Sequence, residues 1–284
     1  MKNLNIIIFF SFLITIYCIP QEIKTNLRVT AENSKSLTLA EQIKLRFNNK
    51  AMLKVASIAV HTPLKGKNSV WIRTAKGKFY KDGGFGGSIN GNAPKTCKKL
   101  ATNAKGELYA IDENLKLSKL KDTGKKNKWK WVSVMNDVKD VTVDLNQQVW
   151  VLTKKGDIYN VNDVKDEKGK QFGKKNYGKK AIAIAATFDT DQVIYVVDKN
   201  GDVNRQTAKS QTRIYPNINA IDVCVDPSGN LFIASGMGIY RKLATNKDVS
   251  VIGSGMAKHI DCGLNILWVV GDDDYPYESS YIKN

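Results

Sequence analysis

Residues 131–159 decide the fold, and they read WVSVMNDVKDVTVDLNQQVWVLTKKGDIY. Short apolar runs at 131–134, 141–143, 149–152 and 158–159 alternate with polar residues that favour turns. β-Branched and aromatic residues dominate these runs, as is typical of strands. Gly156 supplies the positive φ that a tight hairpin needs. The stretch therefore predicts short antiparallel strands joined by turns.

The same pattern recurs along the chain. Six times an aromatic residue lies inside an aliphatic or β-branched run, and the intervals between successive aromatics are 38, 41, 45, 37 and 36 residues. These aromatics, which we expect to pack in the core, are Trp71, Tyr109, Trp150, Tyr195, Phe232 and Trp268. A strand pattern precedes each one, and a turn with a third strand follows several. Four short strands repeated at this period describe a propeller blade. We predict an all-β fold, a six-bladed β-propeller of four-stranded antiparallel blades.

The two ends of the repeat array predict how the ring closes. Segment 43–47 has the pattern of a fourth strand, and the chain stops after the third strand of the sixth unit. An N-terminal strand would then complete the last blade and cover its open edge. We divide the chain into a signal peptide (1–18), an N-terminal extension (19–40) and the propeller (41–284).

The third repeat resembles the tectonin repeat, whose outline is W-x-x-V, then V-x-V-x-x-x-G-x-V-W-x-V, then G-x-I-Y. Segments 131–134, 141–152 and 156–159 follow this outline, and Gly238-Ile239-Tyr240-Arg241 matches its end. Gln147 stands where the family commonly has glycine, and the second and fourth repeats lack the opening tryptophan. The resemblance implies a secreted lectin of the tachylectin and fish-egg-lectin kind, which binds cell-surface glycans or bacterial lipopolysaccharide at several sites.

The N-terminal residues predict entry into the secretory pathway. Lys2 precedes an apolar run that ends near Pro20, and the polar segment 21–24 follows. The run is shorter than the roughly 20 residues that span a bilayer. We therefore predict a cleaved signal peptide, no membrane span, and a protein that is secreted or lies in the lumen of the secretory pathway.

The chain is strongly basic, with a formal net charge of +17. Such a field favours acidic partners: anionic lipid, sulfated or sialylated glycans, or other anionic surface polymers. Secretion argues against nucleic acid as a partner. The alternative is compositional, because the chain is rich in both lysine and asparagine, as chains from AT-rich genomes are.

Three cysteines lie beyond the signal peptide, so at most one disulfide can form and one thiol is left over. Cys224 and Cys262 fall in the innermost strands of adjacent blades, 8 and 6 residues before their aromatics. This mismatch leaves their pairing open but does not favour it, and Cys97 is the expected unpaired cysteine.

Sequence motifs of catalysis are absent. The chain has no Gly-x-Ser-x-Gly elbow, no phosphate-binding loop and no His-Glu-x-x-His. Its two histidines, His61 and His259, lie in inner-strand segments of the first and sixth blades, and we expect structural roles for both. We predict that the chain is not an enzyme. A calcium-dependent propeller hydrolase that gathers its groups from several blades is the alternative.

The first candidate ligand site is the cluster Asp272, Asp273, Asp274, Tyr275 and Tyr277 between the second and third strands of the last unit. Carboxylates can hold calcium, and the two tyrosines can stack on a sugar ring. The alternative is a solvated acidic turn in a basic protein.

Two further candidates lie in loops. Phe85 is displayed in Gly83-Gly84-Phe85-Gly86-Gly87, and Lys126, Lys128 and Trp129 form a basic run with an aromatic that suits an anionic glycan or lipid headgroup. A loose linker and a solvated loop are the respective alternatives.

Three functions follow, in order of preference. The first is a secreted lectin that binds glycans at several loop sites, where avidity offsets weak single sites. The second is a scaffold propeller that binds another protein, and the third is the calcium-dependent hydrolase. No cofactor is predicted, with calcium at the aspartate cluster as the open alternative.

Overall fold

The computed structural model describes residues 54–62, 68–81, 96–103, 105–122, 129–144, 146–161, 170–171, 181–187, 193–245, 249–253 and 255–280. These residues form six antiparallel sheets of three or four strands and contain no helix. Accordingly, none of them belongs to a helix that could cross a membrane.

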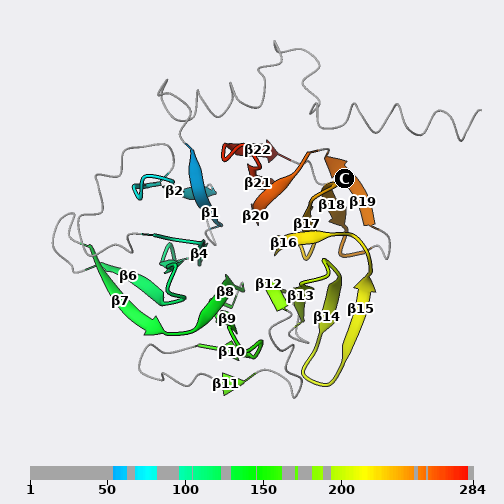
Figure 1. The fold of residues 1–284 in the computed structure, drawn as a ribbon, viewed down its shortest axis with the longest axis horizontal. Coiled ribbons are helices and arrows are strands. Elements are labelled where there is room, and N and C mark those ends of the chain that lie inside the picture. Colours follow the sequence, from blue (N-terminus) through cyan, green and yellow to red (C-terminus); the bar gives the residue numbers. More distant parts are fainter. Residues whose placement is uncertain are drawn as a thin grey trace, which may run out of the picture.

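Within each sheet the strands lie side by side in chain order, from the centre of the molecule outward (Figure 1). The first three sheets comprise β1 (Val55–His61), β2 (Ser69–Thr74) and β3 (Phe79–Lys81); β4 (Lys99–Thr102), β5 (Leu108–Ile111), β6 (Leu117–Asp122) and β7 (Trp129–Met135); and β8 (Val138–Val143), β9 (Val149–Thr153), β10 (Ile158–Asn160) and β11 (Lys170–Gln171). The last three comprise β12 (Ala181–Ala186), β13 (Ile194–Asp198), β14 (Val203–Gln206) and β15 (Gln211–Tyr215); β16 (Ala220–Val225), β17 (Leu231–Ser235), β18 (Gly238–Lys242) and β19 (Val249–Gly253); and β20 (Ala257–Gly263), β21 (Ile266–Gly271) and β22 (Pro276–Ser280).

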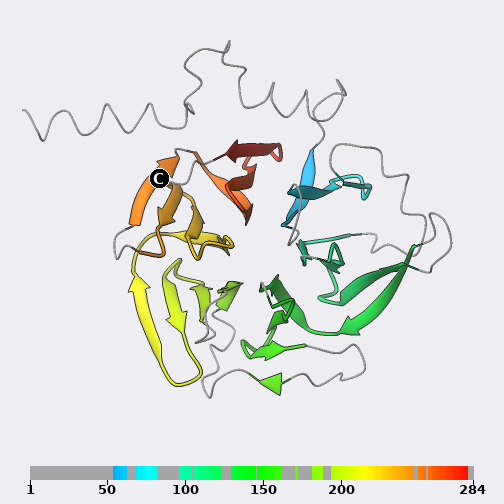
Figure 2. The same ribbon diagram turned by 180° about the vertical axis from the view of Figure 1, so that it is seen from behind.

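The inner strands β1, β4, β8, β12, β16 and β20 surround a common centre (Figures 1 and 2). Each packs against the inner strand of the next sheet, and β20 packs against β1. The Val60 amide donates to Asp261 Oδ2 at 2.7 Å, and the Leu264 amide donates to Thr62 Oγ1 at 3.2 Å. The first and last sheets are therefore direct neighbours.

The core is divided among the contacts between neighbouring sheets. Six apolar clusters exist among the described residues, and each combines residues of two adjacent sheets, including the sixth and the first. Because each sheet is covered on both faces, nearly every residue of the second strands β2, β5, β9, β13, β17 and β21 is buried, with little alternation.

The six repeated aromatics occupy these clusters, one each, and in every case the aromatic of one sheet packs toward the following sheet. All six are buried, and Phe232 and Trp268 are completely so, at 0% exposure. The prediction that they are core residues is confirmed.

The sheets agree with the predicted strands where turn signals were strong. The third strand β6 was not predicted, because its turn contains Leu115 at φ 62° where a glycine would have marked it. Gln147, at φ 66°, takes the conformation of the glycine it replaces. The proposed closing strand 43–47, the signal peptide and the N-terminal extension lie outside the described residues. The first and sixth sheets have three strands within the described part of the chain.

Replacing Trp268 tests whether the contact between the last and first sheets stabilises the molecule as the others do. We expect Trp268→Ala and Phe232→Ala each to lower the free energy of unfolding by about 3–5 kcal/mol, since both remove a fully buried aromatic. Urea unfolding followed by fluorescence and circular dichroism measures both. Val251→Ala, at an exposed position of β19, is the control and should stay within about 0.5 kcal/mol. A small loss for Trp268→Ala beside a large one for Phe232→Ala would contradict a closed ring.

Candidate functional site

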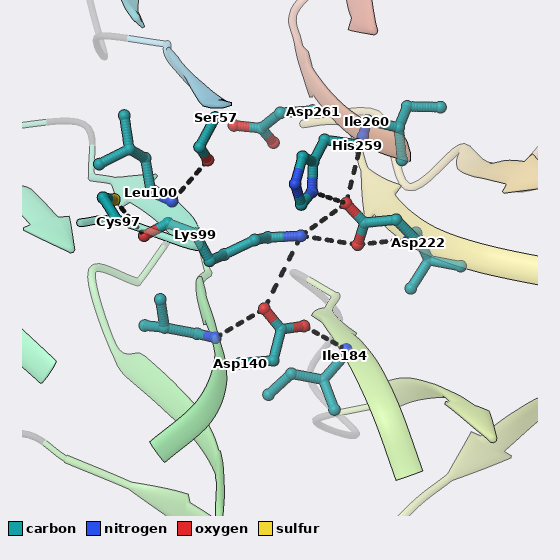
Figure 3. Close-up of polar contacts among 12 residues, drawn as sticks. Ser57, Cys97, Lys99, Leu100, Asp140, Ile184, Asp222, His259, Ile260 and Asp261 are labelled. Atoms are coloured by element: carbon teal, nitrogen blue, oxygen red, sulfur yellow. Dashed lines mark hydrogen bonds and ion pairs between the residues drawn. The ribbon is translucent and has the colours of Figure 1, made fainter. Parts of the chain in front are cut away.

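One position of the inner strands carries a polar side chain toward the common centre in five of the six sheets. The residues at this position, one per sheet in chain order, are Ser57, Lys99, Asp140, Ala183, Asp222 and His259. In all but the second sheet the residue follows a β-bulge, which redirects the side chain. Figure 3 shows the polar side chains converging from different strands.

Two of the carboxylates connect their own sheet to the next one. Asp140 Oδ2 accepts a hydrogen bond from the Ile184 amide at 2.7 Å, and Asp222 Oδ2 accepts one from the Ile260 amide at 3.1 Å. The other oxygen of each carboxylate accepts from the amide of the following residue in its own strand. Both carboxylates therefore fix adjacent inner strands to each other.

Two further contacts repeat this arrangement. Ser57 Oγ accepts from the Leu100 amide at 2.9 Å, and Asp261 Oδ2 accepts from the Val60 amide. Inner strands have an unpaired edge that faces the centre, and a buried amide without an acceptor is costly. Side-chain oxygens thus bond to that edge at four of the contacts between the described sheets.

Lys99 crosses the centre of the ring. Its Nζ lies 2.6 and 2.7 Å from the two oxygens of Asp222, on the opposite side of the ring, and 3.7 Å from Asp140 Oδ1 (Figure 3). The side chains of Lys99 and Asp222 are 14% and 3% exposed, so this ion pair is nearly buried. His259 Nδ1 lies 3.5 Å from Asp222 Oδ2 on the same side.

Lys99, Asp140, Asp222 and Asp261, which we call the channel groups, have different pKa values because their surroundings differ. Burial alone would raise the pKa of Asp222, but the Lys99 ammonium and His259 lower it to about 2. Burial raises the pKa of Asp261 to about 7 against the opposing effect of its backbone donors and Lys99. Burial likewise raises the pKa of Asp140 to about 6, with Asp222 adding to the rise and Lys99 opposing it. Although burial disfavours the Lys99 ammonium, Asp140 and Asp222 raise its pKa above the ordinary value.

A cavity of about 70 Å³ lies in the channel beside these groups. Lys99 and Asp261 both line it, together with Thr102 and Asn103. The Thr102 hydroxyl is buried and has no hydrogen-bond partner among the described residues. The space exceeds that of a single water, and it suits one functional group of a substrate together with a water molecule.

A calcium ion does not fit this centre. Where a cation would sit between Asp140 and Asp222, the Lys99 ammonium already pairs with both carboxylates. Within the described ranges, the only cluster of metal-ligating side chains is Cys224, Asp261 and Cys262, and its two sulfurs are bonded to each other. Calcium prefers six to eight oxygen ligands.

The cysteine pairing differs from expectation. Cys224 and Cys262 form a disulfide between β16 and β20, with their Cα atoms 6.0 Å apart. The mismatch in sequence offset is no obstacle, because these inner strands belong to different sheets and share no hydrogen-bonded register. Cys97 is free and buried, as predicted, and burial raises the pKa of its thiol to about 12.

The aspartate–tyrosine cluster lies around the turn between β21 and β22, and none of its residues lines the central cavity. Asp274 pairs with Lys258 at 2.5 Å and with Lys54 at 3.8 Å, and the hydrogen bond from Lys258 lowers its pKa. Asp273 accepts hydrogen bonds from the Tyr277 hydroxyl and the Tyr275 amide. Asp272 is exposed. Ligand binding at this cluster stays a prediction. The carboxylates of Asp273 and Asp274 already have partners within the protein.

The other predicted site residues belong to loops at the margins of the described ranges. Phe85, Lys126 and Lys128 lie outside the described residues, and Trp129 is described only as the first residue of β7. The side chain of His61 also lies outside them, so its structural role stays a prediction. The His259 side chain lies beside Asp222, one of the channel groups.

Sequence reasoning missed Lys99, Asp140, Asp222 and Asp261. A signal was present, since a polar residue precedes an aliphatic one at the same phase in five inner strands: Ser57-Ile58, Lys99-Leu100, Asp140-Val141, Asp222-Val223 and His259-Ile260. A polar residue at the same position of an otherwise apolar strand in five of the six repeats indicates a shared centre.

Comparisons with known proteins identify the fold. No protein-family model matches the chain, and curated protein sequences give no match either. A gluconolactonase from Xanthomonas campestris is structurally similar, with 12% identity, a TM-score of 0.55 and coverage of 84% of this chain and 91% of its own. A luciferin-regenerating enzyme shares 14% identity and a TM-score of 0.55 over 81% of this chain and 92% of its own. YCF48 bound to D1 peptide shares 10% identity and a TM-score of 0.52 over 81% and 77%.

The fold is a β-propeller. At these identities the similarity shows the fold alone, and the tectonin resemblance stays a prediction. The prediction that the chain is not an enzyme is overturned, because two of these similar structures are enzymes by name. Propeller enzymes gather their groups from several sheets, so the absence of linear motifs was no ground for that prediction.

Removing the Lys99 ammonium tests the central ion pair. We expect Lys99→Met to cost about 3–5 kcal/mol of stability, because it leaves a buried carboxylate without its counter-charge. Asp222→Asn, which keeps an acceptor for the Ile260 amide, should cost less. In a double-mutant cycle measured by urea unfolding, the double variant should lose about 1–3 kcal/mol less unfolding free energy than the two single variants lose together. Strict additivity would show that the two side chains are not coupled.

The disulfide closes a loop with a sequence separation of 38 residues. We expect the double variant Cys224→Ala/Cys262→Ala to lose about 2–4 kcal/mol of stability, mainly because the unfolded chain gains freedom. Thermal unfolding with and without reductant measures this. Reductant should lower the melting temperature of the natural chain and leave the double variant unchanged; equal responses would argue against the bond.

Proposed function

We propose that this chain is a secreted hydrolase of six-bladed propeller architecture that cleaves a small ester or lactone in its central channel. One observation carries the proposal: Asp261, with a pKa of about 7, and the Lys99 ammonium line the same cavity. A carboxyl group that titrates near neutral pH can exchange protons efficiently, and a fixed positive charge stabilises a developing oxyanion.

Separate pKa values assign separate roles to the carboxyl groups. Asp222, with a pKa of about 2, stays ionised and holds Lys99 charged. Asp261 is partly protonated at neutral pH and can act first as a base and then as an acid. Environments that give neighbouring carboxyl groups very different pKa values are typical of catalytic centres.

The reaction that fits these groups is acyl transfer to water. The Asp261 carboxylate takes a proton from a water molecule, whose oxygen bonds to the substrate's carbonyl carbon. The carbonyl oxygen becomes an oxyanion that faces the Lys99 ammonium. As the carbon–oxygen bond of the ester breaks, the leaving alkoxide takes the proton back from Asp261. The unpartnered Thr102 hydroxyl is available to orient a polar group of the substrate.

The architecture and location in this proposal have their own support. Six apolar contacts, one between each pair of neighbouring sheets, support six blades in a closed ring. The repeat outline supports a tectonin-type origin for those blades. The Cys224–Cys262 bond supports an oxidising compartment and thus the predicted signal peptide. For the loop residues, glycan binding and protein scaffolding stay predictions from the sequence.

Glucono-δ-lactone hydrolysis is the direct test, because it is the substrate class in the name of one similar structure. Ionised Asp261 is the active form, so kcat/KM should rise as the pH increases through about 7 and then level off. We expect Asp261→Asn to lower kcat/KM by about 10²-fold or more and to remove this pH dependence. A pH-stat assay measures both effects, with p-nitrophenyl acetate as the second substrate.

Asp272→Asn, an exposed carboxylate outside the channel, is the matched control and should leave the rate unchanged. A chelator should have no effect, because Lys99 supplies the positive charge. Hydrolysis of neither substrate above the buffer rate, an unaltered rate in Asp261→Asn, or loss of activity on chelation would each reject the proposal.

A further inference from the structure

A second cavity, of about 350 Å³, lies between the fourth and fifth sheets. Tyr195 and Arg205 line it from β13 and β14, and Lys242 lines it from the end of β18. Pro227 and Ser228, in the turn between β16 and β17, form another wall. Its volume falls within the range of small-ligand sites. Pro227 also lines the channel cavity, so the two spaces are neighbours.

Two positive charges converge in this cavity. Arg205 and Lys242 are both half-buried, and neither takes part in any ion pair found among the described residues. Lys242 donates to the carbonyl oxygen of Leu243 at 3.2 Å. Burial lowers the pKa of Lys242, and the nearby Arg205 guanidinium lowers it further. Two adjacent cations without a counter-charge destabilise the free protein, which is typical of a site that receives an anion.

The wall formed by Pro227 and Ser228 is held by hydrogen bonds. Asp226, which is 1% exposed, accepts hydrogen bonds from the Ser228 and Asn230 amides at 2.8 and 2.9 Å and from Asn230 Nδ2 at 2.8 Å. Asn230 Oδ1 in turn accepts from the Ala244 amide at 3.1 Å. This network fixes the turn against the segment that carries Lys242. The cavity is thus shaped in advance, which reduces the entropic cost of binding.

We propose that this cavity binds a tetrahedral oxyanion, the phosphate or sulfate group of a small ester, between the Arg205 guanidinium and the Lys242 ammonium. Guanidinium groups bind such anions in a bidentate manner, and an ammonium adds a point charge. The Ser228 hydroxyl lies in the same wall and can donate a further hydrogen bond. The Tyr195 ring gives the cavity an apolar side for the organic part of the ester. This site is separate from the hydrolytic groups and does not depend on them.

Isothermal titration calorimetry with sodium phosphate and sodium sulfate, at ionic strength fixed with sodium chloride, tests the site. We expect saturable binding to the natural chain and at least a tenfold weaker affinity for Arg205→Gln and for Lys242→Gln. The control Lys209→Gln removes the same charge from an exposed turn of the same sheet and should change affinity less than twofold.

Thermal unfolding separates ligand binding from a structural role. Without anion, Lys242→Gln should be at least as stable as the natural chain, because like-charge repulsion is removed; phosphate should raise the melting temperature of the natural chain but not of this variant. Tighter binding of glucose 6-phosphate than of glucose 6-sulfate identifies a phosphate ester as ligand, and the reverse order a sulfate ester. Lack of saturation by either inorganic anion, or equal affinity for all three variants, would overturn the proposal.

Discussion

The inner edge of each sheet imposes the constraint on which the centre of this molecule depends. A strand that ends its sheet at the centre exposes backbone amides, and these need acceptors where little water reaches. Asp140, Asp222, Asp261 and Ser57 supply them to the adjoining sheet. Acceptors of this strength bring negative charge into the centre, and Lys99 compensates it from the opposite side of the ring. The pKa values of Asp140, Asp222 and Asp261 differ for this reason, because one ammonium cannot lie equally close to all three carboxylates.

The propeller fold could be predicted from the sequence because the residues that form its strands and turns recur at a regular interval and act locally. An aromatic in an apolar run marks a second strand wherever it occurs, and Gly156, Gly201 and Gly238 mark turns at positive φ. It failed where a residue takes an unusual conformation without the usual residue type. Leu115 is such a case, and it concealed β6. The order of strands in each sheet then follows from the short connections between them.

The candidate site was less accessible from sequence. Asp222 and Lys99 are 123 residues apart in the chain, and only the packing of separate sheets around a common centre brings them together. Local density instead favoured the aspartate–tyrosine cluster, where Asp273 bonds to Tyr277 within one turn and ligand binding stays a prediction. The disulfide shows the same limit, since Cys224 and Cys262 meet through the packing of two sheets that share no ladder.

The contacts between sheets have a direction, because each sheet presents its aromatic to the next sheet and receives one from the sheet before. Such a contact is heterologous, in the sense used for subunits of a ring. Trp268 of the sixth sheet packs toward the first sheet, and none of the six repeated aromatics is left exposed. A fragment with fewer sheets would carry an unfilled receiving face at one end and an uncovered aromatic at the other. The two ends of such a fragment would be complementary, so contacts between copies could replace the contact that the missing sheet made within the chain.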